Sequence, residues 1–376
     1  MSKLNQDIDA AIQATTNMNT EDTINTIADG LNSGNDGVVA NAKAMARAVI
    51  TTLTPLLFYQ YIQDLPDLNP MERLVKMFYA GTYTQGNGYM DIVNLPTGAK
   101  NTTSPLDNNQ WVPTAQTTSL IETYQINFFT NNSTPMNQVF APEAFCFEKE
   151  LTIPETQYLE VFKEGNPEKF FSNLKKLVND SFTLFMYDKI AKALTSTIAP
   201  AKTVTGSATN AFECWAKDIN ALIIDMMNYN SSYNYDGTSK YNHYCEKPYI
   251  ICSQLTYETL TANLQSQLFN NAKFDNLDMF NRDRFMLLGN TITYGDQSTA
   301  ITTTANQYIN DTTVILIEPN IIKWIQQFSG EASAYFPTNF TMYFKHYRVM
   351  AMKYTPWAKC VKYTNTNLNT SPNGSN

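Results

Sequence analysis

The sequence has only two histidines and five cysteines among 376 residues, which restricts the metal and redox chemistry it can carry. His243 precedes Cys245 by two residues and Cys252 follows, but this spacing does not match the paired ligands of a structural zinc site. His346 falls within an expected strand, where a pairing or contact role is more common than that of a base. We therefore expect no metal and no cofactor.

Sequence motifs of catalysis are also missing. The chain has no phosphate-binding loop, no dinucleotide-binding glycine pattern, and neither GxSxG nor HExxH. Asp278, Asp283 and Asp296 are acidic residues of expected loops, and their spacing is not that of metal ligands. No set of residue types supports nucleophilic, acid–base or phosphate chemistry, so we predict that the protein is not an enzyme.

Charged residues make up only 16% of the chain, and the net charge is −8. This balance lacks the basic footprint of a nucleic-acid-binding protein. No apolar run approaches the ~20 residues that a membrane span needs. The cysteines form no CxxC pair and the N-terminus shows no apolar signal core, so we expect a cytosolic protein with reduced thiols.

Aromatic residues are abundant, with 22 tyrosines and 21 phenylalanines. A surface rich in tyrosine and poor in charge suits extensive contact between proteins. An alternative cause is an AT-rich genome, whose codons enrich tyrosine and asparagine.

The segment 166–200 predicts one long helix around which the rest of the chain is organised. Pro167 suits the first helical position, and Pro200 is a natural stop. Apolar residues expected on one buried face of its first half are Phe170, Phe171, Leu174, Leu177, Val178, Phe182 and Phe185. After Phe185 the apolar and polar faces exchange. The helix is therefore either a spine that packs against two different partners or an ordinary core helix that breaks near Asp188.

The chain before the spine divides into three parts. Residues 1–37 are polar and predict a loosely held N-terminal arm, ordered only against a partner. Residues 38–82 follow a helical pattern. Residues 83–126 are long, polar and poor in core candidates, which predicts a two-stranded flap with strands at 89–95 and 119–129. A disordered insertion is the alternative.

The rest of the chain predicts an α+β fold. We expect one domain over 127–229, including the spine at 167–198, and a second over 230–320. Residues 321–363 predict strands that return to the first domain, with separate strands at 340–345 and 348–354. A polar tail covers 364–376.

Three stretches carry a resemblance to a known family. They are TIPETQYLEVFKEGNPEKFFSNLKKLVNDSFTLFMYDKIAKAL, KFDNLDMFNRDRFMLLGNTITYGDQ, and ILIEPNIIKWIQQF with FTMYFKHYRVMAMKYTPWAKCV after it. Together with the order of arm, flap, spine, α/β lobe and returning strands, they resemble the major capsid proteins of tailed phages with the Hong Kong 97 fold. In that family the parts are the N-arm, E-loop, spine helix, P-domain and A-domain. The likeness is nearest to small short-tailed phages (podoviruses) of the phi 29 type.

The resemblance implies a structural protein of the virion that self-assembles, through hexamers and pentamers, into an icosahedral shell around a double-stranded DNA genome. It implies assembly in the host bacterial cytoplasm, a portal protein as partner and possibly a scaffolding protein, without specific DNA binding and without a membrane. Expected intersubunit contacts are Tyr89, Met90, Trp111, Asn281 and Arg282. Two alternatives remain: a shell protein of an encapsulin-like nanocompartment, and a phage tail or receptor-binding protein.

Overall fold

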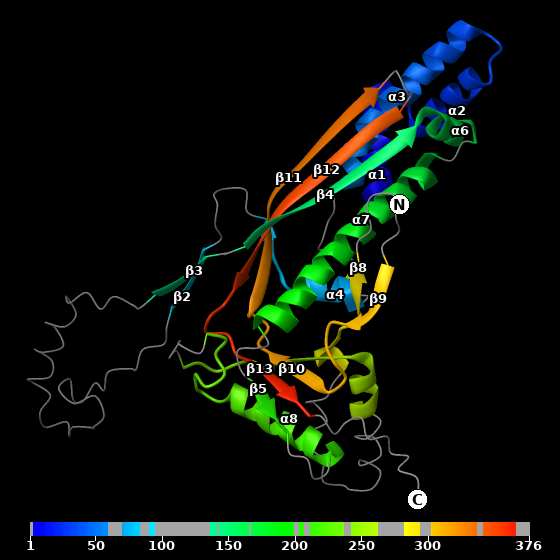
Figure 1. The fold of residues 1–376 in the computed structure, drawn as a ribbon. Helices are drawn as coiled ribbons and strands as arrows, with labels where there is room; N and C mark the ends of the chain where they lie inside the picture. Colours follow the sequence, from blue (N-terminus) through cyan, green and yellow to red (C-terminus); the bar gives the residue numbers. More distant parts are fainter. Residues whose placement is uncertain are drawn as a thin grey trace, which may run out of the picture.

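The structure is a computed structural model that describes residues 3–58, 70–82, 90–94, 136–140, 143–164, 167–198, 203–206, 211–236, 242–261, 282–293, 302–336 and 341–365. Its helices and sheets form an upper lobe built on long strands and a lower lobe built on short ones, connected by one long helix (Figure 1). The α+β class expected from the sequence is confirmed.

The predicted spine is helix α7 (Pro167–Lys192), which continues into a π-helical turn, η3 (Ala193–Ile198). Its 26 α-helical residues span about 39 Å at 1.5 Å per residue. The α-helix passes through Asp188 without interruption, so the alternative of a broken helix is wrong. Figure 1 shows α7 running alongside the long strands toward the lower lobe.

The buried face of α7 shifts along the helix, as the exchange of apolar positions predicted. Val178 packs in a core formed with α3 and α6, whereas Met186, Ile190 and Leu194 pack in the core at the other end of the long sheet. Leu177 was expected on the buried face and is 48% exposed, so that assignment is wrong. Burial follows the i, i+4 line through Val178, and a neighbouring residue lies about 100° around the helix.

A four-stranded sheet lies beside the spine, in the order β1-β11-β12-β4. Its strands are β1 (Tyr79–Thr82), β11 (Ile322–Phe336), β12 (Thr341–Tyr354) and β4 (Glu143–Pro154). β1 pairs parallel with β11, and the other pairs are antiparallel. The two strands expected at 340–345 and 348–354 are one strand of 14 residues, because His346 and Tyr347 continue the in–out alternation between them.

The N-terminal region folds on its own chain, so the expectation of an arm ordered only by a partner is wrong. Its helices are α1 (Lys3–Thr16), α2 (Thr20–Leu31) and α3 (Asp36–Phe58), and α6 (Glu155–Lys163) joins them. Ile12, Ile27 and Leu31 are buried against α3. The side-chain oxygen of Asn19 accepts from the Asp22 N–H and caps α2.

The lower lobe is a five-stranded sheet in the order β5-β13-β10-β6-β7, covered by helix α8 (Ala211–Met227). The strands are β5 (Thr203–Thr205), β13 (Cys360–Thr364), β10 (Thr313–Ile317), β6 (Tyr249–Cys252) and β7 (Phe285–Leu287). Two expected placements are therefore wrong. Helix α8, assigned to the domain 127–229, belongs to this lobe through the buried Trp215, and β13 returns here rather than to the long sheet.

The remaining elements are short. Helix α4 (Pro70–Met77) precedes β1, the turn η6 (Arg282–Arg284) precedes β7, and a further helix covers residues 254–261. Strands β8 (Asn290–Thr293) and β9 (Thr302–Gln307) form one two-stranded ribbon. Strands β2 (Met90–Asn94) and β3 (Met136–Phe140) form another.

The β2–β3 ribbon confirms one part of the flap prediction. The strand expected at 89–95 is present as β2, and its antiparallel partner is β3. The partner expected at 119–129 and most of the polar tail 364–376 lie outside the described residues. Figure 1 shows the ribbon standing to one side of both lobes.

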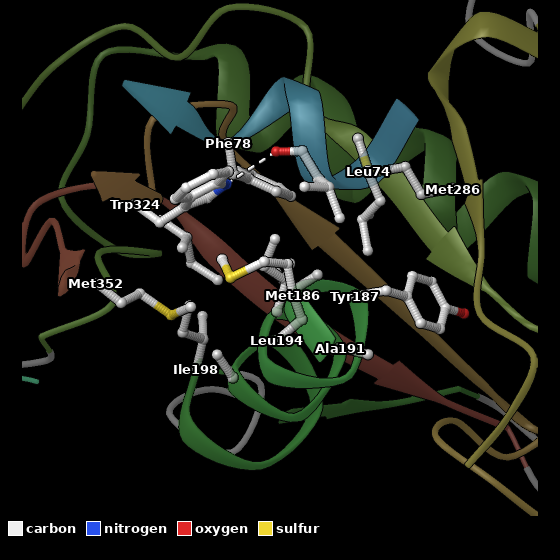
Figure 2. Close-up of a cluster of buried hydrophobic side chains, with 14 of the residues drawn as sticks. Leu74, Phe78, Met186, Tyr187, Ala191, Leu194, Ile198, Met286, Trp324 and Met352 are labelled. Atoms are coloured by element: carbon white, nitrogen blue, oxygen red, sulfur yellow. Dashed lines mark hydrogen bonds between the residues drawn. The ribbon is translucent and has the colours of Figure 1, made fainter. Parts of the chain in front are cut away.

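The upper and lower parts meet in one apolar core. Trp324 on β11 has no exposed area and contacts Phe78, while Met186, Leu194 and Ile198 approach from the spine and its π-helical turn (Figure 2). The indole N–H of Trp324 donates to the Val75 carbonyl at 2.9 Å, so α4 is bonded to the long sheet as well as packed against it.

Candidate functional site

The long sheet has an inner face toward α7 and an opposite face, here called the outer face. Residues of the outer face are Cys146, Glu148, Glu150 and Thr152 on β4, Tyr343, Lys345, Tyr347 and Val349 on β12, and Phe328, Gly330, Ala332, Ala334 and Phe336 on β11. On β12 the residues alternate strictly from 342 to 348, since Phe344, His346 and Arg348 are buried while their neighbours are more exposed. The described residues contain no element that covers the outer face.

Aromatic side chains are unusually exposed on this face. Phe328 is 51% exposed, Phe336 48% and Tyr343 38%. Phe328 stacks with Tyr347 at 5.5 Å between ring centroids, and Phe336 meets Tyr343 edge-on at 5.0 Å. Pairs of this kind hold the rings in place, so the surface presents fixed apolar area to a partner.

A charged cluster lies between the two aromatic pairs. Lys345 forms ion pairs with both Glu148 and Glu150, the second at 3.3 Å, and these hydrogen bonds raise the pKa of Lys345. The cluster is exposed to solvent, so it contributes little to folding stability. It leaves the β4 side of the outer face acidic and the β11 side uncharged.

Buried basic groups lie between the inner face and the spine. The Arg348 guanidinium packs on the ring of Phe182, 4.6 Å from its centroid, and its Nε donates to His346 Nε2 at 2.8 Å. Both residues are 3% exposed. Burial, followed by the Arg348 charge, lowers the pKa of His346 to about 4, so this imidazole is neutral at physiological pH. Burial also lowers the pKa of Arg348, to about 10.

A second polar group fixes the β8–β9 ribbon to the spine. Tyr308 donates to Asp188 on α7 at 2.6 Å, and Lys192 forms an ion pair with the same carboxylate at 2.8 Å. Tyr187, the preceding residue, accepts a hydrogen bond from the Gly289 N–H at 3.0 Å. Burial, followed by the bond to Asp188, raises the pKa of Tyr308 far above its usual range.

The lower lobe contains a lysine without exposed area. The Lys359 ammonium donates to the carbonyls of Met226, Asn228 and His243 at 2.7, 2.7 and 2.9 Å. The Met226 and Asn228 carbonyls lie at the C-terminal end of α8, so the lysine caps that helix and complements its dipole. The Glu318 carboxylate accepts from the Lys359 N–H at 2.9 Å and bonds to His243 Nε2 at 2.8 Å. Burial lowers the pKa of Lys359, partly offset by the charges of Cys245 and Glu318.

The predicted contact residues are only partly described. Met90 begins β2, at the base of the ribbon. Arg282 begins the η6 turn, which is fixed within the chain because Arg73 donates to the Asp283 carbonyl at 2.5 Å. Tyr89, Trp111 and Asn281 lie outside the described residues.

The residues that were considered for a zinc site have different roles in the fold. His243 is bonded to Glu318, whereas Cys252 is buried in the apolar core under α8. Among the described residues, no group of three or more His, Cys, Asp or Glu side chains is placed to hold a metal ion. Within the same part of the chain, no helix has the length and apolar character to cross a membrane.

Sequence reasoning missed the outer face. The alternation in FTMYFKHYRVM could have revealed it, since Tyr343, Lys345 and Tyr347 occupy every second position. The buried Lys359 left no such signal, because its partners are backbone carbonyls from distant segments.

No protein-family model matches the sequence, and no curated protein matches it significantly. Among solved structures, the chain is similar to a capsid structure of Staphylococcus phage Andhra, at 11% identity and a TM-score of 0.49, over 82% of this chain and 87% of that one. It is similar to a chain in the structure of the head fiber and inner core protein of native bacteriophage P68, at 12% identity and a TM-score of 0.49, over 76% and 83%. The head structure of Helicobacter pylori bacteriophage KHP40 gives 10% identity and a TM-score of 0.41, over 83% and 96%. Each of these TM-scores is below one half, so the functional argument rests on this chain's own residues.

Proposed function

We propose that this chain is the major capsid protein of a tailed bacteriophage, with the Hong Kong 97 fold and of the type found in small short-tailed phages. The observation that carries the proposal is the β2–β3 ribbon, which stands to one side of both lobes (Figure 1). An isolated two-stranded ribbon is at best marginally stable in water. A ribbon of this kind is best explained by a neighbouring copy on which it lies.

The body of the molecule suits a shell subunit. A helix of 26 residues packs along strands of 12 to 15 residues, which gives an elongated layer of a helix on a sheet. The outer face exposes aromatic pairs of the kind enriched at protein interfaces. These features fit a protein whose partners are many copies of itself.

The partners follow from this role. Copies associate as hexamers and pentamers, with a portal protein at one vertex and a scaffolding protein during assembly in the host cytoplasm. The mature protein is part of the virion. Double-stranded DNA is enclosed without specific binding, since a chain of net charge −8 repels phosphate. Tyr89, Met90 and Trp111 contact a neighbour through the flap, and Asn281 and Arg282 contact one near the η6 turn.

Shortening the flap tests the proposal. Replacing residues 97–109 with a short Gly-Ser turn should leave the circular dichroism spectrum and the melting temperature of the monomer unchanged, because this segment is polar and Leu106 is its only large apolar side chain. Assembly, followed by sedimentation, should be lost. Leu255→Ser is the control, since Leu255 is 53% exposed on the helix 254–261 of the lower lobe. Normal particles from the shortened chain would contradict the role of the flap, and an unfolded monomer would place the segment in the core.

A further inference from the structure

The two long edges of the four-stranded sheet differ in charge. The edge strand β4 carries Glu143, Glu148, Lys149 and Glu150, and it ends at Pro154. Charges and proline are the devices that keep an edge strand from pairing with another chain. At the other edge, β1 pairs with β11 only as far as Gln326. From residue 327 to 336, no described strand lies beyond β11, and Glu331 is the only charged residue.

The open part of β11 is self-complementary about Ala332. Its outer-face residues are Phe328, Gly330, Ala332, Ala334 and Phe336, so aromatic residues lie at both ends and small residues lie between them. If two copies pair antiparallel with Ala332 facing Ala332, each Phe328 faces Phe336 of the second copy. Directly opposite aromatic pairs are among the favourable cross-strand contacts.

Charge selects this register over its neighbours. With Ala332 on the axis, the register pairs Glu331 with Ser333 of the second copy. A shift that placed Glu331 opposite Glu331 would set like charges directly against each other, which is destabilising. A shift by one residue would move every phenylalanine to the other face. One pairing therefore satisfies both the aromatic and the charged positions.

The side chains next to this edge are held in positions that allow a second copy to approach closely. A Cβ atom built on Gly330 would lie 2.5 Å from both Cζ and the hydroxyl oxygen of Tyr347, so the glycine leaves room for that side chain to lie across the strand. Phe328 stacks on the same ring. The outer-face rings are thus held before any partner arrives, which lowers the entropy lost on association.

We propose that residues 327–336 of β11 pair antiparallel with the same residues of a second copy across a two-fold axis, joining two sheets into one. A contact of this type is isologous, because each copy offers the same surface to the other. The inference rests on the proposed function, since it names one of the contacts by which copies of the chain associate. It differs from the flap contact because it uses the sheet edge alone.

Cysteine crosslinking tests the pairing. In a Cys146→Ser background, which removes the exposed native thiol of the outer face, Ala332→Cys places two cysteines directly opposite each other at about 5 Å between Cα atoms, within disulfide reach. Mild oxidation of assembled particles should convert most of the chain to a dimer on non-reducing gels. Ala334→Cys is the matched control. It has the same face and a similar exposure, but it faces Gly330 of the second copy and should stay monomeric on the gel.

The outcomes separate this inference from the proposed function. Particles that form normally without a crosslink at Ala332→Cys would overturn the pairing and leave the shell role intact. Equal crosslinking at both positions would show a random encounter and would also overturn it. Crosslinked dimers in a preparation that never forms particles would support the pairing and contradict the shell. Ala332→Lys adds a second readout, since two ammonium groups on the axis should reduce assembly without changing the monomer's melting temperature.

Discussion

Arg348 and His346 occupy alternate positions of one strand and bond to each other beneath the sheet, with Nε of the arginine donating to Nε2 of the histidine at 2.8 Å. In register, His346 lies between Glu331 on β11 and Lys149 on β4. The arginine keeps its charge there, and the histidine remains neutral because a proton on Nε2 would remove the acceptor.

This pair predicts a loss of stability in mild acid. The pKa of His346 is about 4 in the folded protein, against 6.5 for an exposed histidine. The unfolded chain therefore takes up a proton first as pH falls. The contribution is complete above pH 6.5 and is lost progressively toward pH 4, by up to about 3 kcal/mol. Denaturant unfolding of the monomer at pH values between 7 and 5 measures this decrease in the free energy of unfolding.

The matched variant for this effect is His346→Gln, which keeps an acceptor for Arg348 without a titrating group. Its free energy of unfolding should change less with pH than that of the native chain. His243→Gln, at the only other histidine, controls for proton uptake elsewhere. An equal pH slope in the native chain and His346→Gln would contradict the prediction.

Lys359→Met should strongly destabilise the lower lobe. The substitution leaves the Met226, Asn228 and His243 carbonyls without their ammonium donor, at a cost of about 3 kcal/mol. Lys362→Met, three residues further along in β13 and only partly buried, should change stability by less than about 0.5 kcal/mol. Urea unfolding followed by tryptophan fluorescence compares the two. A similar midpoint for both variants would show that Lys359 is replaceable.

Substitution by aspartate should have very different effects on folding at two adjacent residues of the spine. Val178→Asp buries a carboxylate in the core shared by α3 and α6 and should prevent folding, since the cost is several kcal/mol. Leu177→Asp should leave the monomer's melting temperature within a few degrees of the native value, because the side chain is 48% exposed. Calorimetry of the soluble monomers distinguishes them, and the reverse order would mean that the helix is rotated.

Tyr308→Phe should loosen the β8–β9 ribbon. The change removes the hydroxyl that donates to Asp188 and accepts from the Ile292 N–H at 3.1 Å, at a cost of about 1–3 kcal/mol. Hydrogen exchange in β8 and β9 should accelerate more than exchange in β12. Tyr244→Phe, on a side chain that is 73% exposed, is the control. Uniform acceleration across the chain would argue against a local role.

The sequence predicted best where local signals mark the ends of an element. The spine at 167–198, which Pro167 opens and Pro200 follows, was found at its position as α7 and the π-helical turn. The prediction for Leu177 was wrong because two adjacent apolar residues do not show which of them lies at the centre of the buried face. In the structure Val178 is buried and Leu177 is exposed. Asp188 could not be recognised as buried, because its partner Tyr308 is distant in the sequence.

The predictions for the N-terminal region and for the lower lobe were wrong for a different reason. Residues 1–37 contain few apolar side chains, but Ile27 and Leu31 meet small residues of α3 such as Ala42 and Ala46, so a sparse pattern was enough to form a core. Strand β13 was assigned by its place in the sequence. Its position beside β10 depends on long-range pairing that no local pattern encodes.

Electron microscopy of the purified chain tests the central claim most directly. The protein should be expressed alone and also with the products of neighbouring genes, then imaged after sedimentation. The account predicts closed icosahedral particles of uniform size, in which the β2–β3 ribbon of each copy lies on another copy. Monomers or small open oligomers under every condition, including coexpression, would contradict it.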